Sequence, residues 1–327
     1  MLSSPDFIHL PYTRDLTEGG IAYALHSLPF MYTRTGSSIY DRLRRTVASV
    51  AVELAFRRYL AEQNVPFEVK GAKPFTDPER YDVSLGGRRC DIKSFLISYR
   101  EQVMEMKRNP QVVLKAPALV PSEQNLSEGR SDKDIYLFAF LSGLIAASQE
   151  DLQKAIYKKQ PYHLVHVMPE AWMRPVKWNP LGALVLKSDS VETQVVEVNG
   201  QDERRETRTV SVELPPNTRV QIESGFCSVA YIQSKSLPNA RIGIHSPLRK
   251  ETHVIGEMDW GNIWVYGLDV LLAGWQTHEE FNRRANPIPE GTRVFQYDRT
   301  RTKNMAVAVS ELKPISELLE RVKEWNT

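Results

Sequence analysis

Hydrophobic positions follow a helical period in one long segment of the chain. Residues 39–63 contain no Gly or Pro, and their apolar residues recur every three or four positions, at Leu43, Val47, Val50 and Leu54. This spacing predicts an amphipathic helix. Glu53 lies at the edge of the apolar stripe, where a carboxylate needs a polar partner, and Arg57, four residues further on, is one candidate.

A period of two appears next, in two short runs joined by Gly86-Gly87. A Gly-Gly pair suits the two-residue turns that close β-hairpins, so residues 82–93 are predicted to form one. Folding about this turn sets Asp82 opposite Asp91, and opposed residues share a face of the sheet. Because side chains alternate along a strand, Lys93 joins both aspartates on that face, and the other face is apolar.

Two opposed carboxylates about 5 Å apart destabilise a hairpin by up to roughly 1 kcal/mol when they are exposed. Deleting one of them should therefore lower stability little. Magnesium would offset the repulsion, since it prefers one or two carboxylates plus phosphate oxygens, and a nearby lysine would hold a phosphate or a water. The alternative is a solvated hairpin in which Arg89 and Lys93 neutralise the aspartates.

The order of these elements resembles the PD-(D/E)xK nuclease superfamily. A helix with Glu53 is followed by a strand near residues 65–72, by Asp82 opening a second strand, and by Asp91-Ile92-Lys93 on a third, with Tyr81 where the motif name has proline. The resemblance implies an α/β fold in which helices flank a mixed central sheet, the restriction-endonuclease-like core.

The resemblance also implies roles for these residues. Asp82 and Asp91 would ligate Mg²⁺ together with the backbone carbonyl of Ile92, and Mn²⁺ is expected to substitute. Glu53 would bind a second metal or orient a metal-bound water, and Lys93 would position or deprotonate the attacking water. The reaction would be in-line hydrolysis of a phosphodiester.

Other chemistries lack their usual motifs. The chain has neither a G-x-x-x-x-G-K-[ST] phosphate loop nor a G-x-S-x-G elbow. Its two cysteines, Cys90 and Cys227, are far apart, which argues against a zinc ribbon or disulfide framework and suits a reducing cytoplasm. His163 and His166 lie three apart in a predicted strand, so they point to opposite faces and should not form a metal pair.

The chain of 327 residues is long enough for two domains. We expect an N-terminal extension at 1–38, a nuclease core at 39–159 and a β-rich inserted or accessory domain at 160–261, where alternation dominates. Residues 262–327 run from a strand into a capped helix, as segments after the central strands of several such nucleases do, and would complete the core. Otherwise residues 180–327 form one accessory domain.

The formal net charge of +2 places any nucleic-acid affinity in local patches. Basic clusters occur at Arg42/Arg44/Arg45, Arg88/Arg89, Lys154/Lys158/Lys159 and Arg204/Arg205/Arg208. Only the Arg88/Arg89 cluster lies next to the predicted active site, and Arg89, close to Asp91 in the sequence, is the candidate nucleic-acid contact. Four aromatic residues would either stack on a base or form core: Trp260, Trp264, Tyr266 and Trp275.

These features together predict a Mg²⁺-dependent endonuclease acting on double-stranded DNA, in restriction or antiviral defence. The alternatives are a repair or recombination nuclease that selects DNA structure, and a non-catalytic nucleic-acid-binding protein that retains the fold. The longest apolar run, residues 135–147, is too short to cross a bilayer, and the start of the chain lacks a signal-peptide pattern. A cytoplasmic protein is expected, with DNA as partner and a homodimer or defence-system proteins as further assemblies.

Overall fold

The computed structural model describes residues 2–31, 38–69, 83–126, 131–223 and 225–325. Contacts divide the chain into two compact units. The first comprises Met1–Tyr23, Arg45–Ile145 and Val265–Thr327, and the second comprises Ala24–Arg44 and Ala146–Trp264. The second unit's longer segment is thus inserted in sequence between two parts of the first. The chain is mixed α/β, as its sequence predicts.

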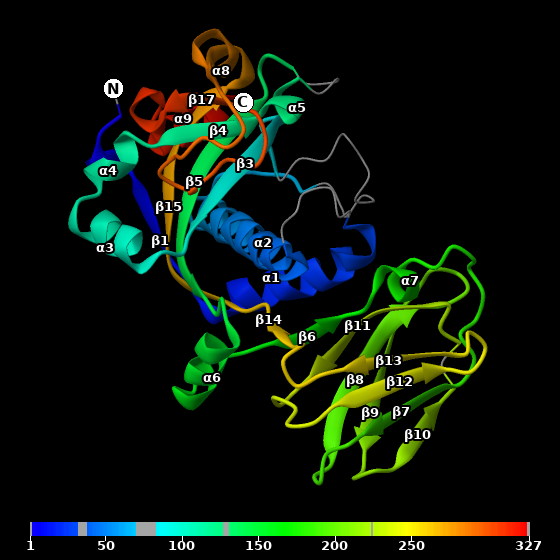
Figure 1. Cartoon of the computed structure of the whole chain (residues 1–327). Coiled ribbons are helices and arrows are strands. Elements are labelled where there is room, and N and C mark those ends of the chain that lie inside the picture. Colours follow the sequence, from blue (N-terminus) through cyan, green and yellow to red (C-terminus); the bar gives the residue numbers. More distant parts are fainter. Residues whose placement is uncertain (1, 32–37, 70–82, 127–130, 224, 326–327) are drawn as a thin grey trace. The chain divides into compact units, whose positions relative to one another are not determined.

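A five-stranded mixed sheet forms the centre of the first unit (Figure 1). Its order is β1 (Ile8–Pro11), β15 (Val265–Thr277), β5 (Ile135–Ile145), β3 (Arg88–Ile97) and β2 (Val83–Leu85). The pair β3–β5 is parallel and the other pairs are antiparallel. Strand β5 is apolar along almost its whole length because both of its faces are covered, and residues 136–141 have no exposed surface.

The predicted long helix is confirmed as α2 (Ile39–Glu62), which follows α1 (Arg14–Ser27). A strand expected near residues 65–72 is represented in the described part of the chain by a single bridge, in which Glu68 and Ser84 exchange backbone hydrogen bonds of 3.0 and 2.8 Å.

One face of the sheet packs against a second layer of short elements. Phe95 of β3 and Phe138 and Phe140 of β5 belong to a core that these elements complete. They are α3 (Arg100–Arg108), α4 (Gln111–Leu114), α8 (His278–Arg284), the turn η3 (Val309–Glu311) and the sheet of β16 (Asn286–Ile288), β17 (Asn304–Ala308) and β4 (Pro117–Pro121). The remaining elements of the unit are η1 (Ser4–Asp6), α5 (Ser122–Asn125) and α9 (Ile315–Trp325).

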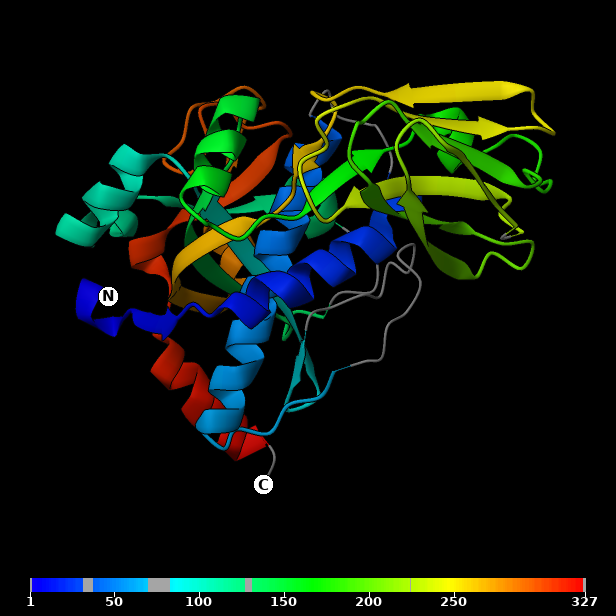
Figure 2. The ribbon, with the colours of Figure 1, turned by 90° about the horizontal axis from the view of Figure 1, so that it is seen from below.

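The second unit is a β-sandwich (Figure 2), as the alternation in this part of the sequence predicts. One antiparallel sheet contains β10 (Arg219–Ile222), β7 (Leu184–Ser188), β12 (Ile242–Ser246) and β13 (Glu251–Ile255). The other contains β14 (Gly261–Asn262), β6 (Leu164–Val167), β11 (Ser228–Ser234), β8 (Gln194–Gln201) and β9 (Thr207–Leu214). Inward residues of both sheets share one core. The helical elements are η2 (Leu28–Phe30), α6 (Gln149–Tyr157) and α7 (Glu170–Met173).

The tryptophans near the end of the sandwich segment are core residues. Trp260, Trp264 and Trp275 are all buried, and Tyr266 is half-buried. Because their rings are covered by protein, these three tryptophans have no free face for a base. Of the two expected roles, stacking on a base and packing in the core, these three tryptophans have the second.

A pair of strand glycines gives a test of the sandwich. A Cβ built on Gly200 of β8 would lie 2.0 Å from the Ser228 carbonyl oxygen, whereas a Cβ on Gly243 of β12 would meet nothing within 4 Å. Gly200→Ala should therefore lower the free energy of unfolding by about 2 kcal/mol or more, because backbone has to move. Gly243→Ala, the matched control, should change it by less than about 0.5 kcal/mol. Urea melts that find equal effects would contradict the packing of β8 on β11.

Candidate active site

The β2–β3 hairpin has the geometry that its Gly-Gly turn predicts. Both glycines have positive φ, +55° at Gly86 and +73° at Gly87, as a type I′ turn requires. Val83 pairs with Cys90, and Ser84 and Leu85 pair with the two arginines that follow the turn. This register confirms the predicted one. Asp82 and Tyr81 lie outside the described residues, so the pairing of Asp82 with Asp91 stays a prediction.

Asp91 and Lys93 meet on one face of β3. The Lys93 Nζ donates to Asp91 Oδ2 over 3.2 Å. The Lys93 side chain is 14% exposed and the Asp91 side chain is 12% exposed. The same ammonium donates to the Gln124 side-chain oxygen over 3.0 Å and lies 5.6 Å from the centre of the Tyr136 ring. A carboxylate, an amide and an aromatic face thus hold this lysine in one orientation.

A polar network surrounds this pair and was not foreseen from the sequence. Tyr136 donates its hydroxyl to Asn125 Oδ1 over 3.1 Å, and Asn125 donates to Asn282 Oδ1 over 2.6 Å. Asp134 accepts from the Arg89 backbone N–H over 3.3 Å. Gln124 and Asn125 form the end of α5. Their adjacency to Lys93 depends on contacts distant in sequence, for which the sequence carries no local signal.

Glu53 is placed on α2 with a side chain that is 14% exposed, and it forms an ion pair with Arg57 one turn later. One turn earlier, Ser49 accepts a 3.0 Å hydrogen bond from Ser94 of β3. Ser94 alternates with Lys93, so this contact lies on the opposite face of the strand from Asp91 and Lys93. The described residues therefore bring Asp91 and Lys93 together and link Glu53 to Arg57. A metal role for Glu53 stays a prediction.

The described residues contain one of the two aspartates that the sequence predicts to ligate magnesium, Asp91. They contain no group of three or more His, Cys, Asp and Glu side chains that could hold a metal. Asp91 is the one predicted carboxylate that the described part of this face contains, and magnesium is commonly held by one or two carboxylates plus substrate phosphates. The side chain of Ile92 is buried on the opposite face, and the metal role of its carbonyl stays a prediction.

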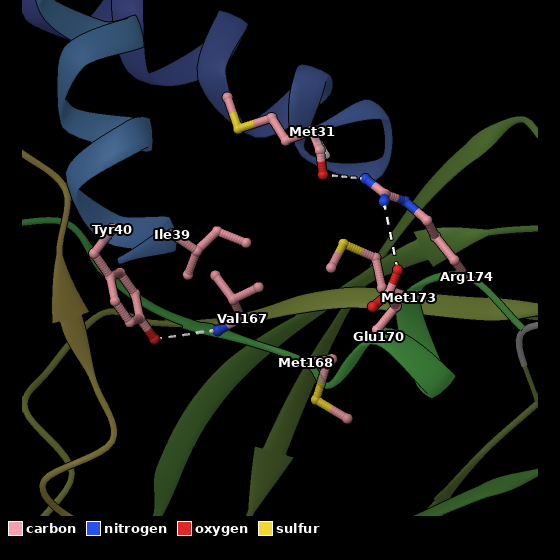
Figure 3. Close-up of a pocket in the computed structure, with 8 residues that line it drawn as sticks. All are labelled: Met31, Ile39, Tyr40, Val167, Met168, Glu170, Met173 and Arg174. Carbon is pink, nitrogen blue, oxygen red and sulfur yellow. Dashed lines mark hydrogen bonds and ion pairs between the residues drawn. The ribbon is translucent and has the colours of Figure 1, made fainter. Parts of the chain in front are cut away.

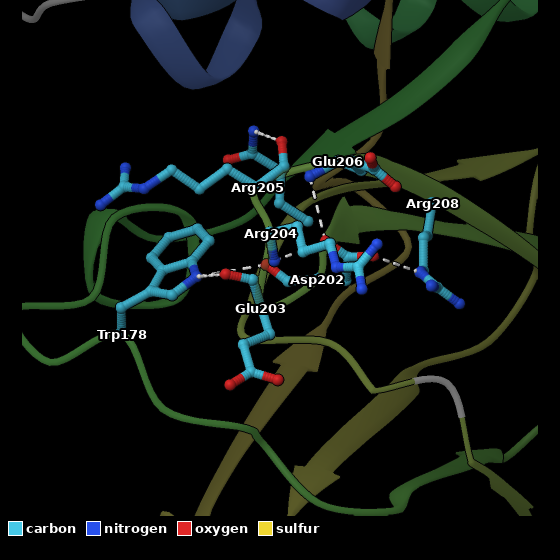
Figure 4. A network of polar contacts seen from close by, with 8 residues as sticks. Trp178, Asp202, Glu203, Arg204, Arg205, Glu206 and Arg208 are labelled. Atoms are coloured by element: carbon cyan, nitrogen blue, oxygen red, sulfur yellow. Dashed lines mark hydrogen bonds and ion pairs between the residues drawn. The ribbon is translucent and has the colours of Figure 1, made fainter.

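The arginine cluster 204–208 lies at the turn between β8 and β9 (Figure 4). The Asp202 carboxylate accepts from the backbone N–H groups of Arg204 and Glu206, over 2.9 and 3.0 Å, and from Arg208 Nε over 2.7 Å. The Arg208 hydrogen bond lowers the pKa of Asp202. Arg205 lies with its guanidinium 4.4 Å from the Trp178 ring centre. The Asp202 carboxylate thus organises the turn, whose three arginines are exposed.

A cavity of about 240 Å³ lies in the second unit (Figure 3). Its lining is mainly apolar and includes three methionines. The lining residues are Met31, Ile39, Tyr40, Val167, Met168, Glu170, Met173 and Arg174. Arg174 donates to the Met31 carbonyl and lies 3.8 Å from Glu170, while Tyr40 accepts from the Val167 N–H over 3.3 Å. Asp91 and Lys93 belong to the first unit, so this cavity is not part of the candidate active site.

Two histidines of the sandwich, His166 and His253, are joined by a hydrogen bond. His166 Nε2 lies 2.9 Å from His253 Nε2, and His166 Nδ1 lies 2.9 Å from the Asp259 carbonyl oxygen. A carbonyl only accepts, so neutral His166 carries its proton on Nδ1 and accepts from His253. Burial lowers the pKa of both rings, and in His253 the charge of His166 lowers it further.

This bond predicts acid sensitivity. With folded-state pKa values below the unfolded value of about 6.5, the folded protein binds fewer protons, so stability is complete above that pH and falls as the pH drops below it. The melting temperature should fall between pH 7.5 and pH 5, and by less in His253→Gln. Burial also lowers the pKa of His163, so this residue contributes the same pH dependence of stability to the wild type and to every variant. In the control His245→Gln, which alters a half-buried ring bonded to Thr252, the fall should match wild type. An unchanged pH dependence in His253→Gln would contradict the assignment.

No family model, no curated protein and no solved structure matches this chain. Within its described residues, none of the helices has the length and apolar character needed to cross a membrane.

Proposed function

We propose that the protein is a Mg²⁺-dependent endonuclease that hydrolyses phosphodiester bonds in DNA at the face of β3 that carries Asp91 and Lys93. The observation that supports it best is the ion pair of these two side chains, two positions apart on a strand that leaves a tight Gly-Gly hairpin with the predicted register. Its context, a mixed sheet with a buried parallel neighbour, suits the restriction-endonuclease-like core.

Each residue then has a task. Asp91 holds the metal, aided by Asp82, while Lys93 orients the attacking water or a phosphate oxygen. Bound magnesium would lower the pKa of water and neutralise charge developing on the phosphoryl oxygens. Lys93 has to turn part of its hydrogen bonding from Asp91 to substrate, and Gln124 holds the ammonium in place during that exchange, since it accepts from the same Nζ over 3.0 Å.

One observation favours a second candidate, a non-catalytic nucleic-acid-binding protein. In the described residues, Asp91 and Lys93 neutralise each other, and Glu53 is paired with Arg57. An ion pair of this kind can be purely structural. We favour catalysis because a charged pair on an interior strand is expensive to desolvate and would be replaced by apolar residues at little loss of stability.

Defence against foreign DNA is the biological setting that we propose, by analogy with nucleases that join a cleavage core to a separate recognition domain. A cleavage assay with a panel of unmodified, base-modified and branched duplexes, in Mg²⁺ and in EDTA, tests it. We expect cleavage in Mg²⁺ only, with discrimination by sequence or modification. A preference for branched substrates would identify a repair enzyme, and metal-independent binding without cleavage would identify the non-catalytic protein.

A further inference from the structure

A cluster of cations and aromatic rings lies at the other end of the hairpin strand. Arg88, the first residue of β3, places its guanidinium carbon 3.5 Å from the centre of the Trp325 ring on α9. Trp325 also packs on the turn, because a Cβ added to Gly86 would lie 2.7 Å from the Trp325 Cβ. The hairpin and α9 therefore fix the plane in which Arg88 lies.

A stacked guanidinium keeps its hydrogen-bonding capacity. The ring contact uses the flat face of Arg88, whereas its N–H donors point outward in the plane of the group, in the fork that matches phosphate oxygens. Side-chain entropy is already lost in the stack, so less has to be lost when an anion binds.

Arg88 has no carboxylate partner among the residues that the structure describes. None of the ion pairs among the described residues involves it, whereas Arg321, one helical turn before Trp325, is paired with Glu317 at 2.7 Å. Burial and the positive charge of Arg321 both lower the pKa of Arg88, and burial contributes more. A half-buried cation beside a second cation is a costly arrangement that an anionic ligand would relieve.

We propose that Arg88, stacked on Trp325 and flanked by Arg321, is a binding site for a phosphate group of a nucleic-acid backbone. It rests on the proposed function, in that DNA is the ligand, and it adds a contact about 10 Å along β3 from Asp91, on the other face of the strand because the two residues are three positions apart. Phosphate contacts position a duplex without reading its sequence. Arg88 thus adds affinity for the duplex at the hairpin end of β3 and does not take part in the chemistry at Asp91 and Lys93.

The test is fluorescence anisotropy of a labelled 20-base-pair duplex with the full chain in EDTA, over a range of salt concentrations. Arg88→Ala should weaken binding about 5- to 10-fold at low salt and reduce the slope of log K against log salt by about one. Arg88→Lys, which keeps the charge without the planar stack, should recover part of the affinity. The matched control is Arg108→Ala, an exposed arginine on α3, which should bind as wild type does.

The outcomes separate the two proposals. If wild type binds duplex and Arg88→Ala binds it equally with the same salt slope, the Arg88 site is wrong and the nuclease proposal stands. A melting temperature lowered in Arg88→Ala with an unchanged slope would make Arg88 a structural staple for α9, which also overturns the site. If wild type binds no DNA, both proposals fail.

Discussion

Asp91→Ala is expected to reduce cleavage about 10³-fold or more, because it removes the carboxylate that holds the metal beside the scissile phosphate. Lys93→Ala should have a comparable effect through loss of the group that orients the water. The control is Ser94→Ala, the next residue on β3, whose hydroxyl bonds to Ser49 on the opposite face. Its cleavage rate should stay within a few-fold of wild type. A plasmid-nicking assay measures all three.

The same substitutions should alter stability. The sequence alone predicts little loss when one aspartate is deleted, on the premise that it sits in a repulsive pair. The structure changes that expectation for Asp91, since its removal takes away the carboxylate that lies 3.2 Å from the nearly buried Lys93 ammonium. We therefore expect Asp91→Ala and Lys93→Ala each to lower the free energy of unfolding by about 3 kcal/mol, and the double variant by less than the sum. Purely additive effects would show that the two charges do not interact.

Substitutions on the β-sandwich should change which substrates are cut. Arg205→Ala and Trp178→Ala remove a stacked pair on the turn that Asp202 organises. If this turn reads bases, each should change the ratio of cleavage rates on preferred and non-preferred duplexes by about 5- to 150-fold, the effect of one lost base contact of 1–3 kcal/mol. Cleavage of a permissive substrate at fixed salt should persist, because the cleavage residues are in the other unit.

The matched control for this prediction is Arg219→Ala, an exposed arginine on β10 in the same unit. Its substrate ratio should equal that of wild type. Should Arg205→Ala and Trp178→Ala also leave the ratio unchanged, the turn is a structural part of the sandwich and does not read bases.

Local periodicity accounts for what the sequence predicts well. The helix at 39–62 and the hairpin register follow from spacing within a few residues, and the structure confirms them. Contacts between distant segments leave no such pattern. Gln124 meets Lys93 and His253 meets His166 only after the chain has folded, so neither residue could be singled out beforehand.

The same limit applies to the predicted metal ligands. Alternation along β3 places Asp91 and Lys93 on one face from sequence alone, whereas the position of Glu53 depends on how α2 packs. Ser49, one turn before Glu53, contacts Ser94, so this part of α2 lies against the other face. Asp82, outside the described residues, is the carboxylate on which a two-aspartate site depends.

The most direct measurement of the central claim is nicking of supercoiled plasmid by purified wild type and Asp91→Ala, side by side, in Mg²⁺ and in EDTA. Circular dichroism on the same preparations establishes that both are folded. We expect wild type to nick in Mg²⁺ only and folded Asp91→Ala to be inactive in both conditions. Equal nicking by the two proteins, or nicking by wild type in EDTA, would contradict a metal-dependent active site on β3.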